Sequence, residues 1–217
     1  MNFFQNMDVW KLHTWQDYLF YIAYVGFFVA VVWYAIKRIN KARNDTAAAK
    51  RVAKQLKKKS GKRKIYTNAT FNFDDKQVTY SNLIVDAAGI VAFKTVGRGL
   101  KIYGTNEDES WKVVDNKGES ARIPNPIAEL RDSFDSLRRY MSKNGIVRIN
   151  IDPLTVFADP FDTPELYLGR DSNCIVFSEV KKWSENRMLR AKNIKDKLDF
   201  DAAVAALDKA LVTTENK

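Results

Sequence analysis

SNLIVDAAGIVAFKTVGRGLKIYG, residues 81–104, carries the clearest structural pattern of this 217-residue chain. Two apolar runs lie on either side of a turn at residues 86–89, and a shorter run follows at 100–103. Apolar runs of this length, rich in Val and Ile and separated by Gly, are typical of successive strands. We therefore expect consecutive buried strands at the centre of a sheet.

The flanking sequence extends this pattern in both directions. An alternating segment at 65–73 precedes it, and Pro124-Asn125-Pro126 then breaks extended structure and begins a helix whose inner face carries Ile127, Leu130, Phe134, Leu137 and Met141. Further strands are expected at 111–114, 147–151, 154–158 and 173–180, and helices at 183–198 and 199–211. Strands alternating with helices predict an α/β domain, a mixed sheet flanked by helices, over residues 65–198, with a C-terminal helix and tail over 199–217.

A second pattern precedes this domain. Residues 18–36 contain no charged side chain, and as a helix at about 1.5 Å per residue they span roughly a 30 Å hydrocarbon core. Aromatic residues gather at both ends of the segment, as at membrane interfaces: Trp15, Tyr18, Tyr21, Trp33 and Tyr34. A signal peptide is the weaker interpretation, because no small-residue cleavage site follows Ile36. A buried core helix is rarely this long and apolar on all sides.

The flanks of this predicted transmembrane helix give its orientation. Lys37, Arg38, Lys41 and Arg43 follow it, whereas residues 1–17 contain one Lys and two Asp. Positive charge is retained on the cytoplasmic side. We therefore expect a single-pass protein of the cell (plasma) membrane, with a short extracytoplasmic segment at 1–17 and a cytoplasmic C-terminal domain.

The net charge of +10 comes from one short block. Residues 37–64 hold thirteen Lys or Arg and one Asp, while residues 65–217 hold 22 basic and 23 acidic side chains. The block predicts a basic juxtamembrane helix that attracts anionic lipid headgroups. Binding to nucleic-acid phosphates and docking to an acidic partner are the alternatives, and all three would use Lys57, Lys58, Lys59, Lys62, Arg63 and Lys64. No aromatic residue interleaves with these lysines, which disfavours a platform for stacking single-stranded bases.

The stretch at 81–104, followed by Trp111 and by PNPIAELRDSFDSLRRYM from Pro124, resembles the nuclease-related domain (NERD) family. The resemblance implies a restriction-endonuclease-like fold. It also implies metal-dependent phosphodiester cleavage, with one carboxylate on the first helix, one on the first hairpin strand, and a Glu-x-Lys on the next strand. Such carboxylates converge to bind Mg²⁺, and the lysine assists the attacking hydroxide.

This sequence departs from that pattern at every catalytic position. The four family residues fall on Ala49, Ser81, Lys94 and Val96, and no Asp or Glu occurs between Ala87 and Asn106. Lys94 would place an ammonium where the cation should bind. We therefore expect a degenerate, inactive member of the family, without a metal or another cofactor.

Other candidate sites are weaker. Glu179 and Lys181 imitate a strand-borne Glu-x-Lys, with Asp159 and Asp162 upstream, but so short a motif is common on surfaces. A phosphate-binding patch is conceivable at Lys94, Arg98 and Lys101, although a solvated turn is the simpler interpretation. The lone His13 lies near the outer interface, far from the domain, and Cys174 reads as a small buried apolar residue.

Three functional hypotheses follow. The leading one is a membrane protein with an inactive nuclease-related domain that serves as a structural or docking subunit beside other membrane-complex subunits. The second is a membrane-tethered protein that binds nucleic acid without cleaving it. The third is an active nuclease that uses Glu179 and Lys181.

Overall fold

A computed structural model describes residues 15–58, 61–74, 76–115, 117–169 and 172–213. The chain forms two compact units, Met1–Lys41 and Ala42–Lys217. The predicted segment 1–17 lies mostly outside the described residues, as do His13 and Lys59.

Helix α1 (Trp15–Ala42) makes up the described part of the first unit. Over Tyr18–Ala42 its mean hydropathy is 2.1 and none of the window is buried. Its large side chains are exposed on all sides, for example Phe20 at 77% and Phe27 at 70%. The protein thus has one helix long and apolar enough to cross a membrane among the residues described, and a buried core helix does not agree with this exposure.

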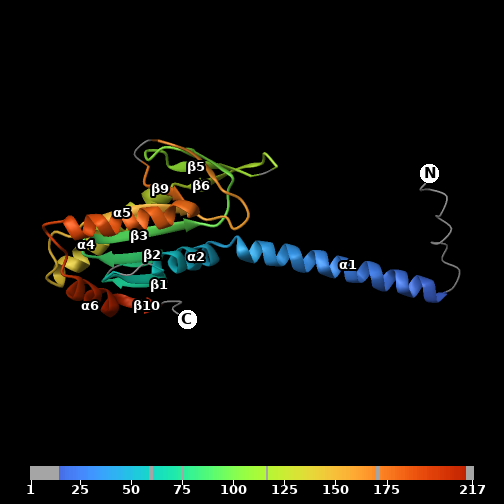
Figure 1. Cartoon of the computed structure of the whole chain (residues 1–217), viewed down its shortest axis with the longest axis horizontal. Helices are drawn as coiled ribbons and strands as arrows, with labels where there is room; N and C mark the ends of the chain where they lie inside the picture. The colour runs from blue at the N-terminus through green and yellow to red at the C-terminus, as the bar shows by residue number, and fades with distance from the viewer. Residues whose placement is uncertain (1–14, 59–60, 75, 116, 170–171, 214–217) are drawn as a thin grey trace. The chain divides into compact units, whose positions relative to one another are not determined.

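The second unit is built on a six-stranded mixed sheet (Figure 1). In spatial order its strands are β10 (Leu211–Thr213), β1 (Lys64–Phe73), β2 (Lys76–Asp86), β3 (Gly89–Val96), β7 (Ile151–Phe157) and β9 (Cys174–Val176). The strands β1, β2 and β3 form antiparallel hairpins, while β3, β7 and β9 run parallel. The predicted mixed α/β architecture is confirmed.

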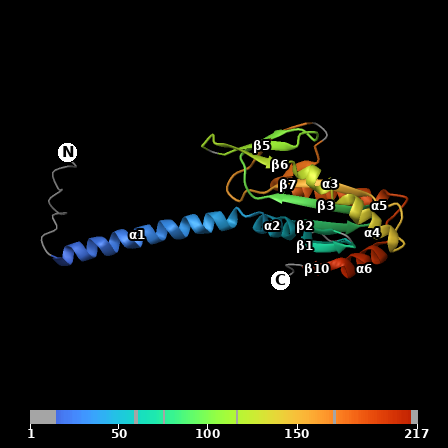
Figure 2. The same ribbon diagram turned by 180° about the vertical axis from the view of Figure 1, so that it is seen from behind.

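Helices cover both faces of this sheet (Figures 1 and 2). On one face α2 (Asp45–Lys57) and α5 (Val180–Asn193) pack on a core that includes Leu56, Ile84 and Phe93. The other face is covered by α3 (Pro126–Arg131), α4 (Phe134–Lys143) and α6 (Phe200–Ala210). Because both faces are buried, the central strands read as continuous apolar runs.

A second, four-stranded sheet contains β6 (Ser120–Pro124), β5 (Ser110–Val114), β4 (Lys101–Gly104) and β8 (Glu165–Leu168), in that spatial order. Its inner side forms a third core cluster around Ile102, Trp111, Ile127 and Phe157. The sequence predicted β4 and β5 alone. The outer strands were missed because segments of only four and five residues, exposed or half-buried throughout, are too short for a periodic pattern to stand out.

Several predicted elements end elsewhere. The helix expected from Pro126 through Met141 divides into α3 and α4. At the break, the Ser133 hydroxyl accepts the Tyr80 hydroxyl at 2.9 Å and donates to the Leu130 carbonyl at 2.6 Å. The strand expected at 147–151 begins only at Ile151, since Arg148 has a φ of 64° and Val147 is 73% exposed. The strand expected at 173–180 ends at Val176 and continues as a 3-10 turn, Phe177–Glu179.

The basic helix α2 belongs to the α/β unit. Asn44 caps its start by accepting the Thr46 N–H at 3.0 Å, and its apolar stripe of Ala48, Ala49, Val52, Ala53 and Leu56 is buried. The predicted linker at 37–64 therefore contributes a core helix, and the boundary between units lies at residue 41. Three of the five buried side chains are alanines, so the stripe gave little hydrophobic signal.

Candidate functional site

The position at which the resemblance implies nuclease chemistry lies between α2 and the strands β2 and β3. Ala49 is fully buried on α2, and its carbonyl accepts the Asn82 side-chain amide at 3.1 Å. Asp45, at the start of α2, accepts the Gly97 N–H at 2.7 Å and so ties the helix to the end of β3. These contacts fix which face of the sheet α2 covers.

The four predicted positions do not converge on that face. Phe93 packs in the core beneath α2, so its neighbour Lys94 points to the opposite face, where its ammonium lies 2.6 Å from Glu129 of α3. Val96 packs against the third core cluster, around Trp111. Ser81 accepts the Thr95 N–H through its hydroxyl at 3.1 Å. The structure thus separates Ala49 from Lys94 and Val96.

Asn82 and Thr95 are buried polar residues that β2 and β3 present on the face covered by α2, beside the apolar Phe93. Both are fully buried. The Asn82 Oδ1 and Thr95 Oγ1 atoms have no hydrogen-bond partner among the described residues. The amide oxygen of Asn82 and the hydroxyl oxygen of Thr95 are neutral, and the side chain of Ala49 has no oxygen. Because Mg²⁺ sites need carboxylates, these residues do not fit the metal that the resemblance implies.

The alternative motif is also dispersed. Glu179 lies in the 3-10 turn and its carboxylate accepts the Val176 N–H at 3.1 Å, while Lys181 is exposed in the first turn of α5. Asp159 and Asp162 both pair with Arg43, at 3.1 and 2.8 Å. Among the described residues, no group of three or more His, Cys, Asp or Glu is arranged to bind a metal.

Part of the predicted basic cluster serves the fold. Arg63 turns inward and donates to the Ser184 hydroxyl at 2.8 Å and to the Leu56 carbonyl. Burial lowers the pKa of Arg63, and the charge of Asp86 opposes that shift. Lys62 pairs with Asp201 at 2.7 Å. The exposed Lys57 and Lys58 remain available to an anionic ligand.

The predicted phosphate patch is likewise divided. Lys94 belongs to the large sheet and pairs with Glu129, whereas Lys101 belongs to the small sheet and lies 3.9 Å from Glu165. Arg98 is exposed between them in sequence. Each lysine therefore already has a carboxylate neighbour.

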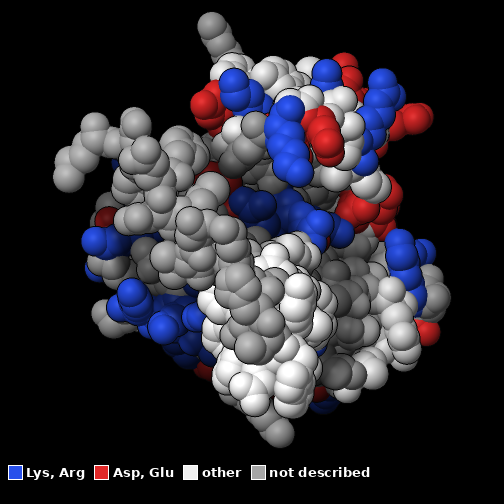
Figure 3. Space-filling model, turned by 90° about the vertical axis from the view of Figure 1, so that its right-hand side faces the viewer, with Lys and Arg blue, Asp and Glu red and all other residues white. Residues whose placement is uncertain are grey.

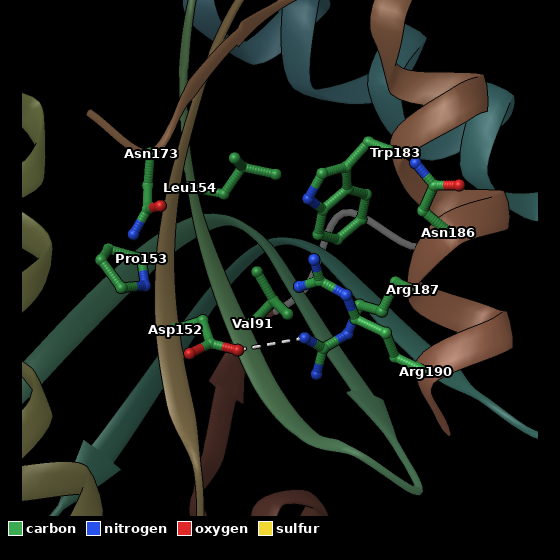
Figure 4. A pocket seen from close by; sticks show the side chains of 9 residues that line it. All are labelled: Val91, Asp152, Pro153, Leu154, Asn173, Trp183, Asn186, Arg187 and Arg190. Carbon is green, nitrogen blue, oxygen red and sulfur yellow. Dashed lines mark hydrogen bonds and ion pairs between the residues drawn. The ribbon is translucent and has the colours of Figure 1, made fainter. Parts of the chain in front are cut away.

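A pocket of about 250 Å³ between α5 and β7 was not predicted (Figure 4). Arg187 enters it from α5 and bridges two carboxylates, Asp86 at 2.7 Å and Asp152 at 3.1 Å. Trp183 stands over Phe93 edge to face, and Arg190 extends from the next turn of α5. No sequence signal links these residues, because the carboxylates come from strands 35 and 101 residues away.

The resemblance residues around Trp111 form one structural cluster. The Trp111 indole donates to the Thr105 carbonyl at 2.7 Å, and Gly104 lies so close to the ring that a Cβ there would be 2.3 Å from it. Asn125 donates to the Asp108 carbonyl at 2.8 Å and caps α3 by accepting the Ile127 N–H at 3.0 Å. These residues hold the small sheet against α3, which is a structural role.

Cys174 is the remaining reactive group. It is half-buried on β9, and burial raises the pKa of its thiol to about 12. A nucleophilic thiolate is therefore disfavoured at neutral pH.

No family model matches this chain, and no match was found among curated proteins or among solved structures.

Proposed function

We propose that this chain is a single-pass membrane protein whose α/β unit is a docking subunit of a membrane assembly and does not cleave phosphodiesters. The observation that carries the proposal is the chemistry between α2, β2 and β3. Ala49, Asn82 and Thr95 offer no anionic oxygen there, and Lys94 points to the other face of the sheet. Without such chemistry, the features of the protein that remain to serve a function are its surface and its membrane anchor.

The anchor rests on α1. A helix of 28 residues that exposes Phe, Val, Ile and Trp on all sides is suited to the apolar core of a lipid bilayer rather than to water. The cations after the apolar segment, including Lys37 and Arg38, support a cytoplasmic α/β unit. A reporter enzyme fused after Lys217, active only in the cytoplasm, tests this orientation, and activity of a periplasm-specific reporter instead would reverse it.

The docking proposal is tested by extracting the full chain from its membrane in mild detergent and measuring the mass of the particle. We expect the chain to migrate with at least one other protein in a fixed ratio. A lone monomer in a detergent that preserves other membrane complexes would contradict the proposal.

Binding to nucleic acid without cleavage is the second candidate. Exposed Lys57 and Lys58 at the end of α2 favour it. Against it, Lys62, Lys94 and Lys101 all lie near carboxylates, and Arg63 is turned inward. Docking to a protein therefore remains the first proposal.

A further inference from the structure

The outer face of the four-stranded sheet carries a row of exposed side chains, one from each strand. The strand register places Tyr103 of β4 opposite Tyr167 of β8 and Lys112 of β5, and it places Lys112 opposite Arg122 of β6. Directly opposed residues project from the same face of a sheet. Four strands at about 4.8 Å spacing make this row, Tyr167–Tyr103–Lys112–Arg122, roughly 14 Å long. We call it the Tyr–Lys–Arg row.

The alternation of each strand keeps the row outside. The neighbouring residues Ile102, Trp111 and Ile123 pack on the inner side with Phe157. Tyr103 and Tyr167 are 38% and 51% exposed, and Lys112 and Arg122 are exposed as well. Neither cation has an ion pair with another residue that the structure describes. Two large rings, and two cations without an ion pair in the described part of the chain, thus face solvent together.

The tyrosine pair is pre-organised. Its ring centroids are 4.7 Å apart and the ring planes differ by 6°, so the rings stack. The Tyr167 hydroxyl donates to Glu165 at 2.6 Å, which holds the outer ring in one orientation. Rings that are already ordered lose little conformational entropy on binding, which favours recognition.

A shallow hollow of about 560 Å³ adjoins the row. Tyr103, Lys112 and Arg122 line it on one side, and Asp108 and Glu109 contribute carboxylates. Figure 3 shows blue and red side chains interspersed over the upper part of the molecule, where this sheet lies. The two carboxylates repel the phosphates of a polyanion and offset the attraction of the two cations, which argues against nucleic acid.

The composition suits a protein instead. Tyr and Arg are the residues most enriched in the energetic centres of protein interfaces. Resting on the docking function proposed above, we infer that the Tyr–Lys–Arg row is the docking surface. Its occupant is a segment of another membrane-complex subunit that places carboxylates on Lys112 and Arg122 and an aromatic or proline side chain on the tyrosine pair.

The size of the row fits a partner held in the same membrane. A row of roughly 14 Å is much smaller than the ~800 Å² that each partner buries in a standard interface, so this contact alone is weak. Anchoring both proteins in one bilayer raises the effective concentration of the partner and makes a small contact sufficient.

The test is site-specific photo-crosslinking of the full chain in its own membrane. A benzophenone amino acid replaces Ser110, which lines the hollow, and in a matched control it replaces the exposed Lys182 on α5. We expect irradiation at position 110 to give an adduct with a peptide of a second membrane-associated protein that contains Asp or Glu, identified by mass spectrometry.

Charge reversal then tests the mode of contact. We expect Lys112→Glu with Arg122→Glu to reduce the adduct at least tenfold, while Lys117→Glu on the adjoining hairpin leaves it unchanged. Substituting Lys for the acidic residues of the mapped partner peptide should restore the adduct with the reversed row. Arg122→Glu alone should reduce the adduct several-fold. Because Arg122 lies on an edge strand, this single variant tests the contact even if the double variant fails to fold.

The remaining outcomes separate this inference from the docking function. Adducts at position 182 with none at 110 would overturn the row and leave the docking function intact. No adduct at either position, together with a monomeric chain in detergent, would remove both. An adduct at 110 with nucleic acid, with a second copy of the chain, or with a peptide that lacks acidic residues would overturn the row as an acidic-segment site.

Discussion

Arg187 of α5 donates two hydrogen bonds from its guanidinium to the carboxylate of Asp86, at the end of β2. The Nε atom lies 2.7 Å from Oδ2 and Nη2 lies 3.1 Å from Oδ1, and the side chains are only 12% and 11% exposed. A paired fork of this kind orients both groups, and it fixes the C-terminal part of the chain to the first hairpin. The same guanidinium reaches Asp152 on β7, so one side chain joins three elements.

Arg187→Met should therefore be strongly destabilising. The variant leaves Asp86 nearly buried without its two guanidinium hydrogen bonds, with the Ala88 N–H as a donor and the charge of Arg63 nearby, and breaking a buried pair typically costs about 3 kcal/mol or more. We expect denaturation of the full chain in detergent to give a free energy of unfolding lower by about 3 kcal/mol. Arg190→Met, one turn further and exposed, is the matched control and should change that free energy by less than about 0.5 kcal/mol. Similar losses in the two variants would contradict the role of the fork.

Incubation of the full chain with plasmid or RNA and Mg²⁺ or Mn²⁺ should give no cleavage above the buffer rate. The reason is that Asn82 and Thr95, the buried polar side chains beside Ala49, carry no carboxylate, and the Glu179 carboxylate accepts a backbone N–H within its own turn. Glu179→Ala serves as the comparison, and we expect the same background from both proteins. Metal-dependent cleavage that disappears in Glu179→Ala would establish the nuclease hypothesis.

The central strands could be predicted from sequence, but their faces could not. Residues 83–85 and 90–93 are apolar without alternation because both faces of the sheet are covered, and such a run does not show which side chains share a face. The resemblance to the nuclease-related domain placed two of its implied catalytic positions on Ser81 and Lys94. The structure puts their neighbours Asn82 and Thr95 on the face beneath α2, a difference of one residue that reverses the direction of each side chain.

Contacts between residues far apart in the chain could not be predicted from the sequence, for a different reason. The Asp86–Arg187–Asp152 bridge and the Tyr–Lys–Arg row join residues from separate strands and helices, and no local pattern marks them. The lysines of the basic block at residues 37–64 led to the opposite error, because the sequence suggested contacts with a ligand where the structure has contacts within the fold. Lys62 and Arg63 make tertiary contacts with α6 and α5, so charge density in sequence overstated the free cations on the surface.

Alkylation of Cys174 should be slow in the folded protein. With the thiol pKa raised to about 12 by burial, the thiolate is much rarer at pH 8 than for an ordinary cysteine. We expect iodoacetamide to react with the native chain at least about tenfold more slowly than with the urea-unfolded chain, as measured by intact mass. Because the neutral thiol is favoured in the folded state, its contribution to stability is complete below about pH 9 and is lost as the pH rises toward 12. Equal rates of alkylation would show that the thiol is accessible and ordinary.

Gly104→Ala should loosen the four-stranded sheet. The new Cβ would lie 2.3 Å from the Trp111 ring, which is fully buried and cannot retreat without losing its bond to Thr105. Overpacking of this kind typically costs about 1–3 kcal/mol. We expect a red shift in the tryptophan emission to which Trp111 contributes, and lower stability, whereas Gly118→Ala, at a hairpin tip with open space around it, reports the effect of a Cβ without a clash. Because Gly118 has a φ of 80°, that control carries its own backbone cost, so the fluorescence shift is the discriminating measurement.

Retention on single- or double-stranded DNA measures how many cations are available to phosphate. Each phosphate contact contributes about −0.9 to the slope of log affinity against log salt on duplex DNA. Lys57 and Lys58 are exposed at the end of α2, while Lys62, Lys94 and Lys101 lie near carboxylates, so we expect these two lysines to contribute about −2 to the slope. Lys57→Gln with Lys58→Gln should make the slope shallower by about that amount, and Lys117→Gln on the small sheet should leave it unchanged. A slope of about −5 or steeper in the wild type would mean that the carboxylate pairs open to release their lysines, and it would favour the nucleic-acid hypothesis over docking to a protein.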